Sequence, residues 1–401
     1  MKIAKIEPLV LRAPYGEMEA YWAQGFWGER PQGAAKPPVL SPQRVRDTTL
    51  WRYRAAYPAH IDTTLVRVTT DDGLVGYGES HAPIAPEVAA TIIDTLLAPL
   101  LLGENPLATD RLWEKMYASM RIRGHHTGFM AEAMAGVDIA LWDIAGKAAG
   151  LPIHLLMGGD YHERVRCYQS HLPVLEPDEM AAIAAHHAQE GYHGIKISGG
   201  AGLAVDVRNV ERIREAVGPG VELMLDAGGV YDVPTASRIG RALERSGVLF
   251  FEDPLPPEDH AGYAELCRTL DVAVATGEAD ATRYQFARRL ERRGVDVVLP
   301  DVSRSGGLTE TRKIAMLADV HNVRLCPHNS VCSAVHHAAS LQLCAAIPNF
   351  LFYEFWAGHN PLLDITTAPL VLDRGYLTVP QGPGLGIEID ENKLERLRVR
   401  R

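Results

Sequence analysis

Seven ionisable side chains stand at the ends of short apolar runs in the second half of the chain. In order they are Lys196, Asp226, Glu252, Glu278, Asp301, His328 and Glu354. Four of the intervals between neighbours are 26 or 27 residues, which is the length of one strand followed by one helix. In a parallel barrel the carboxyl ends of all strands share one face, so we expect these side chains to converge on a single site.

Three of the seven are carboxylates from successive runs, namely Asp226, Glu252 and Glu278. Crowded together they would repel one another, and at least one would hold a proton unless a cation lay between them. An oxygen-only ligand set without a nearby Cys or His favours Mg²⁺ over zinc. The alternative is that each carboxylate makes its own salt bridge or helix cap, which suits a single residue better than three in register.

The pair Asp301 and His328 comes from the next two runs. A carboxylate beside a histidine orients the ring, fixes its tautomer and stabilises its cation, which makes the histidine a better general base. The chain has 16 histidines, and we expect most of them to be structural. His328 stands apart because it ends an apolar run one unit after Asp301.

Lys196 and Glu354 complete the set. Lys196 lies in GIKIS, and a lysine in such an apolar run needs an anionic partner, either the metal-binding carboxylates or the substrate. The alternative is a structural lysine whose ammonium group reaches solvent. Glu354 ends FLFYEF, where it could act as an acid or pair with an arginine.

Eight short apolar runs supply the strands, and helical stretches alternate with them. The runs cover residues 164–172, 194–198, 221–227, 248–254, 272–278, 295–301, 322–328 and 350–355. Runs without polar alternation are typical of strands buried on both faces, and hence of a parallel sheet. Eight such units over about 200 residues favour a TIM-like barrel. A doubly wound sheet is the alternative, although no GxGxxG motif opens any of the helices.

The first part of the chain has the pattern of an α+β unit. Residues 6–12 and 63–79 alternate polar and apolar side chains, and a hairpin turn is expected at residues 71–73. Residues 86–149 have helical spacing, and Gly150-Leu151-Pro152 ends the last helix. Residues 15–58 are rich in Pro, Gly and aromatic side chains, which favours a lid over the site, with a plain surface loop as the alternative.

Composition excludes several classes of function. The 401 residues, 47% of them hydrophobic, suffice for a barrel and an accessory domain. The net charge of −10 argues against nucleic acid or an anionic membrane surface as a partner. The five cysteines contain no CxxC pair, so no disulfide framework is expected. No run of 18 apolar residues occurs, so no membrane span is expected either. We therefore expect a soluble cytoplasmic protein.

The carboxylates in LMLDA, FFEDPLP and ATGEA, followed by PDVSRSGG and RLCPHNS, resemble the mandelate racemase subgroup of the enolase superfamily. The resemblance covers essentially the whole chain. It implies an α/β fold with a modified TIM barrel of (β/α)7β type over residues 136–370. An α+β capping domain over residues 1–135, completed by residues 371–401, is implied as well, and so is a homo-oligomer.

The resemblance also implies a role for each candidate residue. Asp226, Glu252 and Glu278 would ligate Mg²⁺, which would hold the substrate carboxylate and stabilise the enediolate formed when the α-proton leaves. Four residues would be catalytic. His328, paired with Asp301, would be the base. Lys196, the first lysine of the family's KxK motif, would contact the carboxylate, and Glu354 would hydrogen-bond the enediolate.

Two departures from the family pattern guide the expected reaction. Ser198 replaces the second KxK lysine, and Gly228 stands where relatives carry Asn or a His acid. Serine does not easily remove an α-proton without its own base, which disfavours a two-base racemase. We expect syn dehydration of a sugar acid, an aldonate or aldarate. His328 would take the α-proton and protonate the leaving β-hydroxyl, giving a 2-keto-3-deoxy acid.

Other functions stay open. The same scaffold could catalyse racemisation, epimerisation or cycloisomerisation, or could bind Mg²⁺ without turnover. A glycosidase could use Glu252 and Glu278 as acid and nucleophile and would need neither Asp226 nor a metal ion. A basic segment could contact a polyol chain or a second carboxylate, or could simply be a turn between helices. Its residues are Arg121, Arg123, His125 and His126.

Overall fold

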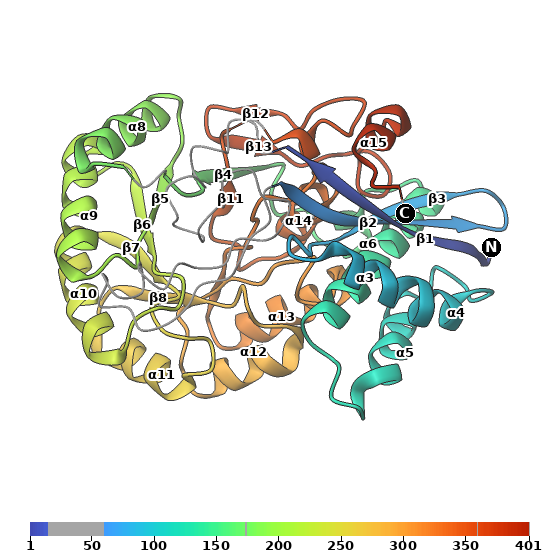
Figure 1. Ribbon diagram of the computed structural model, residues 1–401, viewed down its shortest axis with the longest axis horizontal. Coiled ribbons are helices and arrows are strands. Elements are labelled where there is room, and N and C mark those ends of the chain that lie inside the picture. Colours follow the sequence, from blue (N-terminus) through green and yellow to red (C-terminus); the bar gives the residue numbers. More distant parts are fainter. Residues whose placement is uncertain (15–59, 173–174, 359, 401) are drawn as a thin grey trace.

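A computed structural model describes residues 1–14, 60–172, 175–358 and 360–400. A closed barrel lies beside a three-stranded sheet that is covered by helices (Figure 1). The expected lid over residues 15–58 lies outside the described residues. Among the residues described, no helix has the length and apolar character needed to cross a bilayer.

In the described part of the chain, eight parallel strands form the barrel. They are β4 (Arg164–Gln169), β5 (Gly194–Ser198), β6 (Glu222–Asp226), β7 (Val248–Glu252), β8 (Ala273–Thr276), β9 (Val297–Val298), β10 (Arg324–Leu325) and β11 (Tyr353–Phe355). Strands β4 to β10 pair in chain order, and β11 pairs with β4. A bridge from Leu325 to Phe350 closes the ring. The expected α/β barrel is confirmed.

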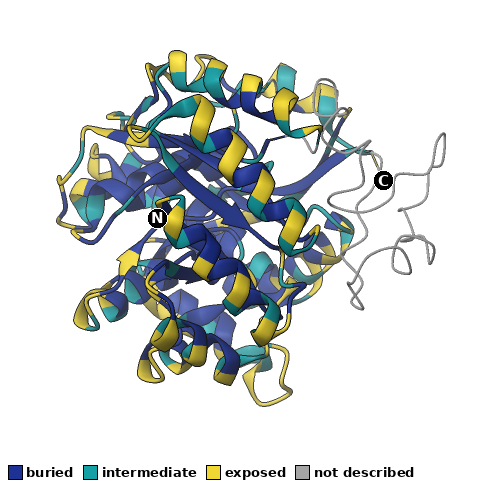
Figure 2. Ribbon diagram, turned by 90° about the vertical axis from the view of Figure 1, so that its left-hand side faces the viewer, coloured by how far each residue is buried: buried dark blue, intermediate teal, exposed yellow. Residues whose placement is uncertain are grey.

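Helices cover the outside of the barrel, and all except α14 (Ala334–Ala346) have exposed residues on their outer faces (Figure 2). They are α8 (Pro177–Gln189), α9 (Leu203–Val217), α10 (Val233–Arg245), α11 (His260–Thr269), α12 (Thr282–Glu291), α13 (Leu308–Val320) and α14 (Ala334–Ala346). Local sequence sets several of their starts. The side chains of Asp232, Asp259 and Ser333 accept backbone N–H groups at the starts of α10, α11 and α14.

The inside of the barrel is filled with apolar side chains. They are Tyr168, Met224, Phe250, Ala275, Val297, Leu299, Cys326 and Phe352. Side chains two residues apart on a strand share a face, so Asp226 and Glu252 point to the same interior as Met224 and Phe250. The polar groups at the strand ends therefore stand over an apolar floor.

The capping domain is built on an antiparallel sheet. Its elements are β1 (Ile3–Ala13), β2 (Ile61–Thr70), β3 (Val75–Ser80), α3 (Pro86–Ile92), η2 (Ile93–Leu97), α4 (Ala98–Leu101), α5 (Thr109–Arg121) and α6 (Phe129–Ala149). The expected hairpin joins β2 and β3, and Gly73 supplies its positive φ of 88°. A Cβ on Gly78 would lie 1.9 Å from the carbonyl oxygen of Gly136, so β3 packs directly on α6. The helical stretch expected over 86–149 is interrupted at 102–108 and 122–128.

The last part of the chain contacts both units. The helix α7 (Ile153–Leu156) precedes the first barrel strand. After the last barrel strand, β12 (Leu372–Asp373) and β13 (Tyr376–Thr378) pair with each other, and β13 pairs with β4. The chain then passes through α15 (Glu391–Leu397) to the capping sheet, where the backbone N–H of Val399 donates to the Val10 carbonyl at 2.9 Å. Helix α6 runs through the expected domain boundary at residues 135–136.

Candidate active site

All eight barrel strands carry a polar side chain at their midpoint, at their carboxyl end or just beyond it. In barrel order these are His171, Lys196, Asp226, Glu252, Glu278, Asp301, His328 and Glu354. The structure thus brings all seven predicted residues to one mouth and adds His171. Only His171 and Glu278 are part-exposed, and the other six are buried.

His328 is held between two carboxylates. Its Nδ1 donates to Asp301 Oδ2 at 2.9 Å, and its Nε2 lies 2.8 Å from Glu278 Oε2. Burial alone would lower the pKa of His328, but Glu278 and Asp301 outweigh it and raise that pKa well above its ordinary value. In the same way His328 outweighs burial and lowers the pKa of Glu278 to about 2. The imidazole is therefore a cation in this arrangement.

Asp301 is fully buried and ionised. Its Oδ1 accepts the backbone N–H of Ser303 at 2.8 Å, while Oδ2 accepts from His328. Burial would raise the pKa of Asp301, yet the nearby His336 and the hydrogen bond from His328 hold it well below its ordinary value. Asp301 thus fixes the His328 ring with its proton on Nδ1.

Lys196 is buried and bridges two of the carboxylates. Its Nζ lies 2.5 Å from Glu354 Oε1 and 3.1 Å from Glu252 Oε1. Glu354 also accepts from Ser170 Oγ at 2.7 Å and from the backbone N–H of Asn329 at 2.8 Å. Despite burial, Lys196 holds the pKa of Glu354 far below its ordinary value. Glu354 therefore pairs with a lysine where an arginine was one expectation, and it is an ionised acceptor.

The predicted metal ligands lie in two different surroundings. Asp226 and Glu252 are neighbours across β6 and β7, whereas Glu278 turns to His328. Burial raises the pKa of Asp226 to about 6 and that of Glu252 well above its ordinary value, against the opposing effect of Lys196. Within the described ranges, no three His, Cys, Asp or Glu side chains form a cluster able to hold a metal ion.

Oxygen chemistry at Asp226 and Glu252 nevertheless fits a hard divalent cation. Glu252 Oε2 is buried and has no hydrogen-bond partner among the described residues. A buried carboxylate oxygen without a donor is costly, and a cation would satisfy it. The metal-binding role of the three carboxylates stays a prediction, with Asp226 and Glu252 as the pair that the geometry favours.

Two family models match the chain. One, described as mandelate racemase / muconate lactonizing enzyme, N-terminal domain, matches residues 42–158. The other, described as enolase C-terminal domain-like, matches residues 179–393, which is more than half of the chain. The chain belongs to the enolase superfamily. The predicted family and its barrel-with-cap fold are confirmed.

Individual members of the superfamily resemble the chain over most of its length. D-galactarolactone cycloisomerase of Agrobacterium fabrum is 36% identical over 85% of this chain and 92% of its own. Arabinonate dehydratase of Saccharolobus solfataricus is 34% identical over 88% of this chain and 95% of its own. A solved structure of a racemase from Streptomyces coelicolor A3(2) with bound magnesium has a TM-score of 0.82 at 27% identity, covering 99% and 100% of the two chains. Dehydratases among the relatives bear out the expected lyase class.

His171 is the site residue that sequence reasoning missed in this enolase-superfamily chain. Ser198 Oγ donates to the Leu172 carbonyl at 3.3 Å, so the contact of 3.2 Å with His171 Nδ1 requires the proton to be on Nδ1. His171 Nε2 lies 3.7 Å from Asp226 Oδ2. Its backbone has a φ of 48°, a strained value that is found at functional sites. His171 is the penultimate residue of the run 164–172, so the strand-end criterion could have found it.

The basic segment that was a candidate for contact with the substrate packs on aromatic rings and reaches solvent. Arg121 lies over the rings of Tyr117 and Tyr284 at 5.5 and 5.6 Å, and Arg123 and His125 are exposed, which favours the basic-turn interpretation of this segment.

Proposed function

We propose that this enolase-superfamily enzyme is a Mg²⁺-dependent dehydratase of a sugar acid, an aldonate or aldarate, with a 2-keto-3-deoxy acid as product. The observation that carries the proposal is the buried Asp301–His328 pair, joined at 2.9 Å, beside a position where Ser198 replaces a second basic residue. One strong base suits a reaction in which a proton is removed and returned on the same side. Relatives named as sugar-acid dehydratases support the substrate class.

Proton transfer in this proposal belongs to His328. Its Nδ1 stays bonded to Asp301, and its Nε2 takes the α-proton of the substrate. Glu278 is the group that holds a proton on Nε2 in the structure, at 2.8 Å. His328 can therefore act as base only when Glu278 has another partner.

Elimination completes the reaction. The α C–H bond breaks with its proton on His328, the β C–O bond breaks, and the His328 cation protonates the leaving hydroxyl to give water. The enol that remains becomes the 2-keto-3-deoxy acid. Lys196 is the nearest ammonium group for the substrate carboxylate, since its Nζ already lies between Glu354 and Glu252.

Asp226, Glu252 and Glu278 are the residues that would hold the Mg²⁺ ion. When bound, the ion would supply positive charge for the substrate carboxylate and for the charge that grows on its oxygens as the α-proton leaves. The unpartnered Glu252 Oε2 supports this role. A solved relative with bound magnesium supports the choice of metal.

A second candidate is cycloisomerisation of a lactone. It also begins with removal of the α-proton, but no water is lost in the overall reaction. It is favoured by the 36% identity to a D-galactarolactone cycloisomerase. It is also favoured by His171, a second imidazole at the mouth with an ordered contact to Ser198. The two candidates differ in the group that leaves the β-carbon, which is water for an open-chain acid and the ring carboxylate for a lactone.

Proton NMR in D₂O with Mg²⁺, across mono- and diacid sugars and their lactones, separates the candidates. We expect 3-deoxy-2-keto signals that EDTA abolishes and that His328→Ala removes. The matched control is His186→Ala, which replaces an exposed histidine on α8 and should keep the wild-type rate. Dehydration by His328→Ala at the wild-type rate would overturn the proposal, and a 3-deoxy-2-keto product from lactones alone, with the open-chain acids unchanged, would select cycloisomerisation.

A further inference from the structure

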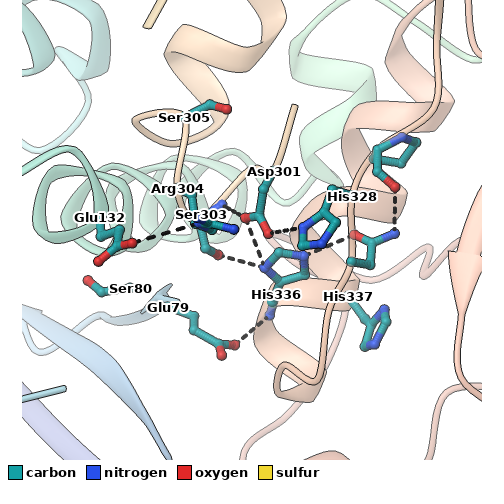
Figure 3. A network of polar contacts seen from close by, with 12 residues as sticks. Glu79, Ser80, Glu132, Asp301, Ser303, Arg304, Ser305, His328, His336 and His337 are labelled. Carbon is teal, nitrogen blue, oxygen red and sulfur yellow. Dashed lines mark hydrogen bonds and ion pairs between the residues drawn. The ribbon is translucent and has the colours of Figure 1, made fainter. Parts of the chain in front are cut away.

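A buried chain of hydrogen bonds joins the capping domain to the Asp301–His328 pair, and the proposed reaction makes no direct use of it (Figure 3). It begins at Glu79 on β3 and passes through the start of α14 to His336. From His336 it reaches Ser303 on one side and Asn329 on the other. Glu79, Ser303, Asn329 and His336 are each at most 1% exposed.

Glu79 caps α14 from the other domain. Its oxygens accept the backbone N–H groups of Ser333 at 3.2 Å and of His336 at 3.1 Å, and the Ser333 hydroxyl as well. Thr63 Oγ1 donates to the same carboxylate from within the capping sheet at 2.7 Å. A carboxylate at a helix N-terminus is favourable because it meets otherwise unpaired N–H groups and the positive end of the helix dipole. The capping domain therefore stabilises the start of α14 together with the Ser333 side chain, which accepts the backbone N–H of Val335.

His336 lies in the first turn of α14 and contacts both loops that carry the catalytic pair. Asn329 Nδ2 donates to the carbonyls of Glu354 and Pro327, so its Oδ1 must accept from His336 Nε2, at 2.9 Å. His336 Nδ1 lies 2.8 Å from Ser303 Oγ. One imidazole thus joins the loop after β9 to the loop after β10.

Each contact of His336 leads to a residue of the mouth by one further bond. The backbone N–H of Ser303 donates to Asp301 Oδ1 at 2.8 Å, and His336 Nδ1 itself lies 3.8 Å from that oxygen. The backbone N–H of Asn329 donates to Glu354 Oε2 at 2.8 Å. Asp301 and Glu354 are therefore held from the same ring, and Asp301 in turn orients His328.

We propose that His336 is a positioning residue for the Asp301–His328 pair and that Glu79 is its anchor, so that the capping domain orders the catalytic histidine of the barrel. The role in catalysis rests on the proposed function. The positional claim does not, because it concerns where the His328 ring lies.

The neighbouring residue His337 provides a matched control. It is on the same helix and as deeply buried, but its Nδ1 contacts Tyr353 Oη at 3.0 Å and not the Asp301–His328 pair. Thr63→Val is the matched control for Glu79, because it removes a partner of Glu79 in the capping sheet and leaves the bonds to α14 in place.

The test compares kcat, KM and imidazole NMR of the full chain for His336→Leu, His336→Gln, His337→Leu, Glu79→Gln and Thr63→Val. Misplacement of a catalytic group by about 1 Å costs about 10²-fold in rate, so we expect that loss in kcat for His336→Leu with KM within about threefold. His336→Gln, which keeps a donor toward Asn329, should have a kcat about tenfold higher than that of His336→Leu. Glu79→Gln should lose about tenfold, and both control variants should stay within about threefold.

The NMR readout is the Nδ1–H signal of His328. We expect it to shift in His336→Leu and Glu79→Gln and to stay in His337→Leu and Thr63→Val. If the wild type turns over no sugar acid, the proposed function fails and this signal still tests the positioning role. An unmoved signal in His336→Leu, or an equal loss of kcat in His336→Leu and His337→Leu, would overturn the proposal.

Discussion

At Asp301 and Glu354 the charges of the barrel mouth are balanced by partners within the protein, whereas at Asp226 and Glu252 Lys196 balances them only in part. Asp301 and Glu354 accept bonds from His328, Ser303, Lys196 and Asn329 and have pKa values below their ordinary range. Asp226 and Glu252 are as deeply buried, yet burial raises their pKa values, and Glu252 keeps an oxygen without a donor. Equal burial therefore has opposite consequences in the two halves.

The difference separates two kinds of functional group. The half that is matched internally is preorganised, which suits a base that must hold one orientation. The other half has buried carboxylates that Lys196 balances only in part, which suits a cation site. Lys196 lies between the halves and contacts a carboxylate in each.

The largest expected effect comes from replacing the general base, His328, in the half whose charges are balanced within the protein. His328→Asn keeps a polar side chain but removes the proton acceptor, and general-base catalysis contributes up to about 10⁴-fold. We expect kcat to fall by about that factor while Mg²⁺ binding persists. Steady-state kinetics and Mg²⁺ titration of the same sample check this. A variant within tenfold of wild type would show that another group removes the proton.

Removing the link between the halves should cost stability. Lys196→Met leaves Glu252 and Glu354 buried without their shared cation, and breaking a buried pair costs about 3–5 kcal/mol. Urea unfolding measures the loss. Lys115→Met, which breaks the more exposed pair with Glu104, is the control and should cost less than about 1 kcal/mol. Equal losses would contradict the importance of burial at Lys196.

Without metal, the raised pKa of Asp226 should make the free energy of unfolding depend on pH. The pKa of Asp226 is about 6 in the folded protein against 3.8 for the unfolded chain. Between these values the folded state binds more protons, so its stability should fall as the pH rises from about 4 to 6. The difference corresponds to about 3 kcal/mol. Urea unfolding in EDTA should show a steeper fall in wild type than in Asp226→Asn, because Glu252 also has a raised pKa and titrates in both.

The smallest expected effect is at Ser198. Its hydroxyl makes two long hydrogen bonds, to Leu172 at 3.3 Å and from His171 at 3.2 Å. Each is worth about 1 kcal/mol or less. Ser198→Ala should therefore change kcat for dehydration by less than about fivefold, as measured by product formation. A loss near that of His328→Asn would assign proton transfer to the His171–Ser198 side of the mouth.

Much of the mouth could be predicted from the sequence, because a parallel barrel converts regular spacing along the chain into proximity in space. That rule found seven residues of the mouth. It missed His171, since the run that ends there contains Arg164, Arg166 and Gln169 and reads less clearly as a buried strand. Strand spacing also does not tell which way a side chain turns, so the contact of Glu278 with His328 was not predicted, and its grouping with Asp226 and Glu252 as metal ligands stays a prediction.

The support behind the mouth could not be predicted in this way. Glu79 and Ser333 are 254 residues apart, and their contact depends on how the capping domain docks on the barrel. His336 is one of 16 histidines, and no local pattern distinguishes it from His337. Such contacts follow from tertiary packing, which has no fixed period along the chain.

Isothermal titration of Mg²⁺ into wild type, Glu252→Gln and Asp301→Asn at pH 7 tests the contrast between the two halves most directly. We predict that wild type and Asp301→Asn bind the ion with similar Kd values. Glu252→Gln should bind it at least about tenfold more weakly, because it loses the unsatisfied carboxylate oxygen. Undiminished binding by Glu252→Gln, or its loss in Asp301→Asn alone, would contradict the assignment of the cation to the Asp226–Glu252 half.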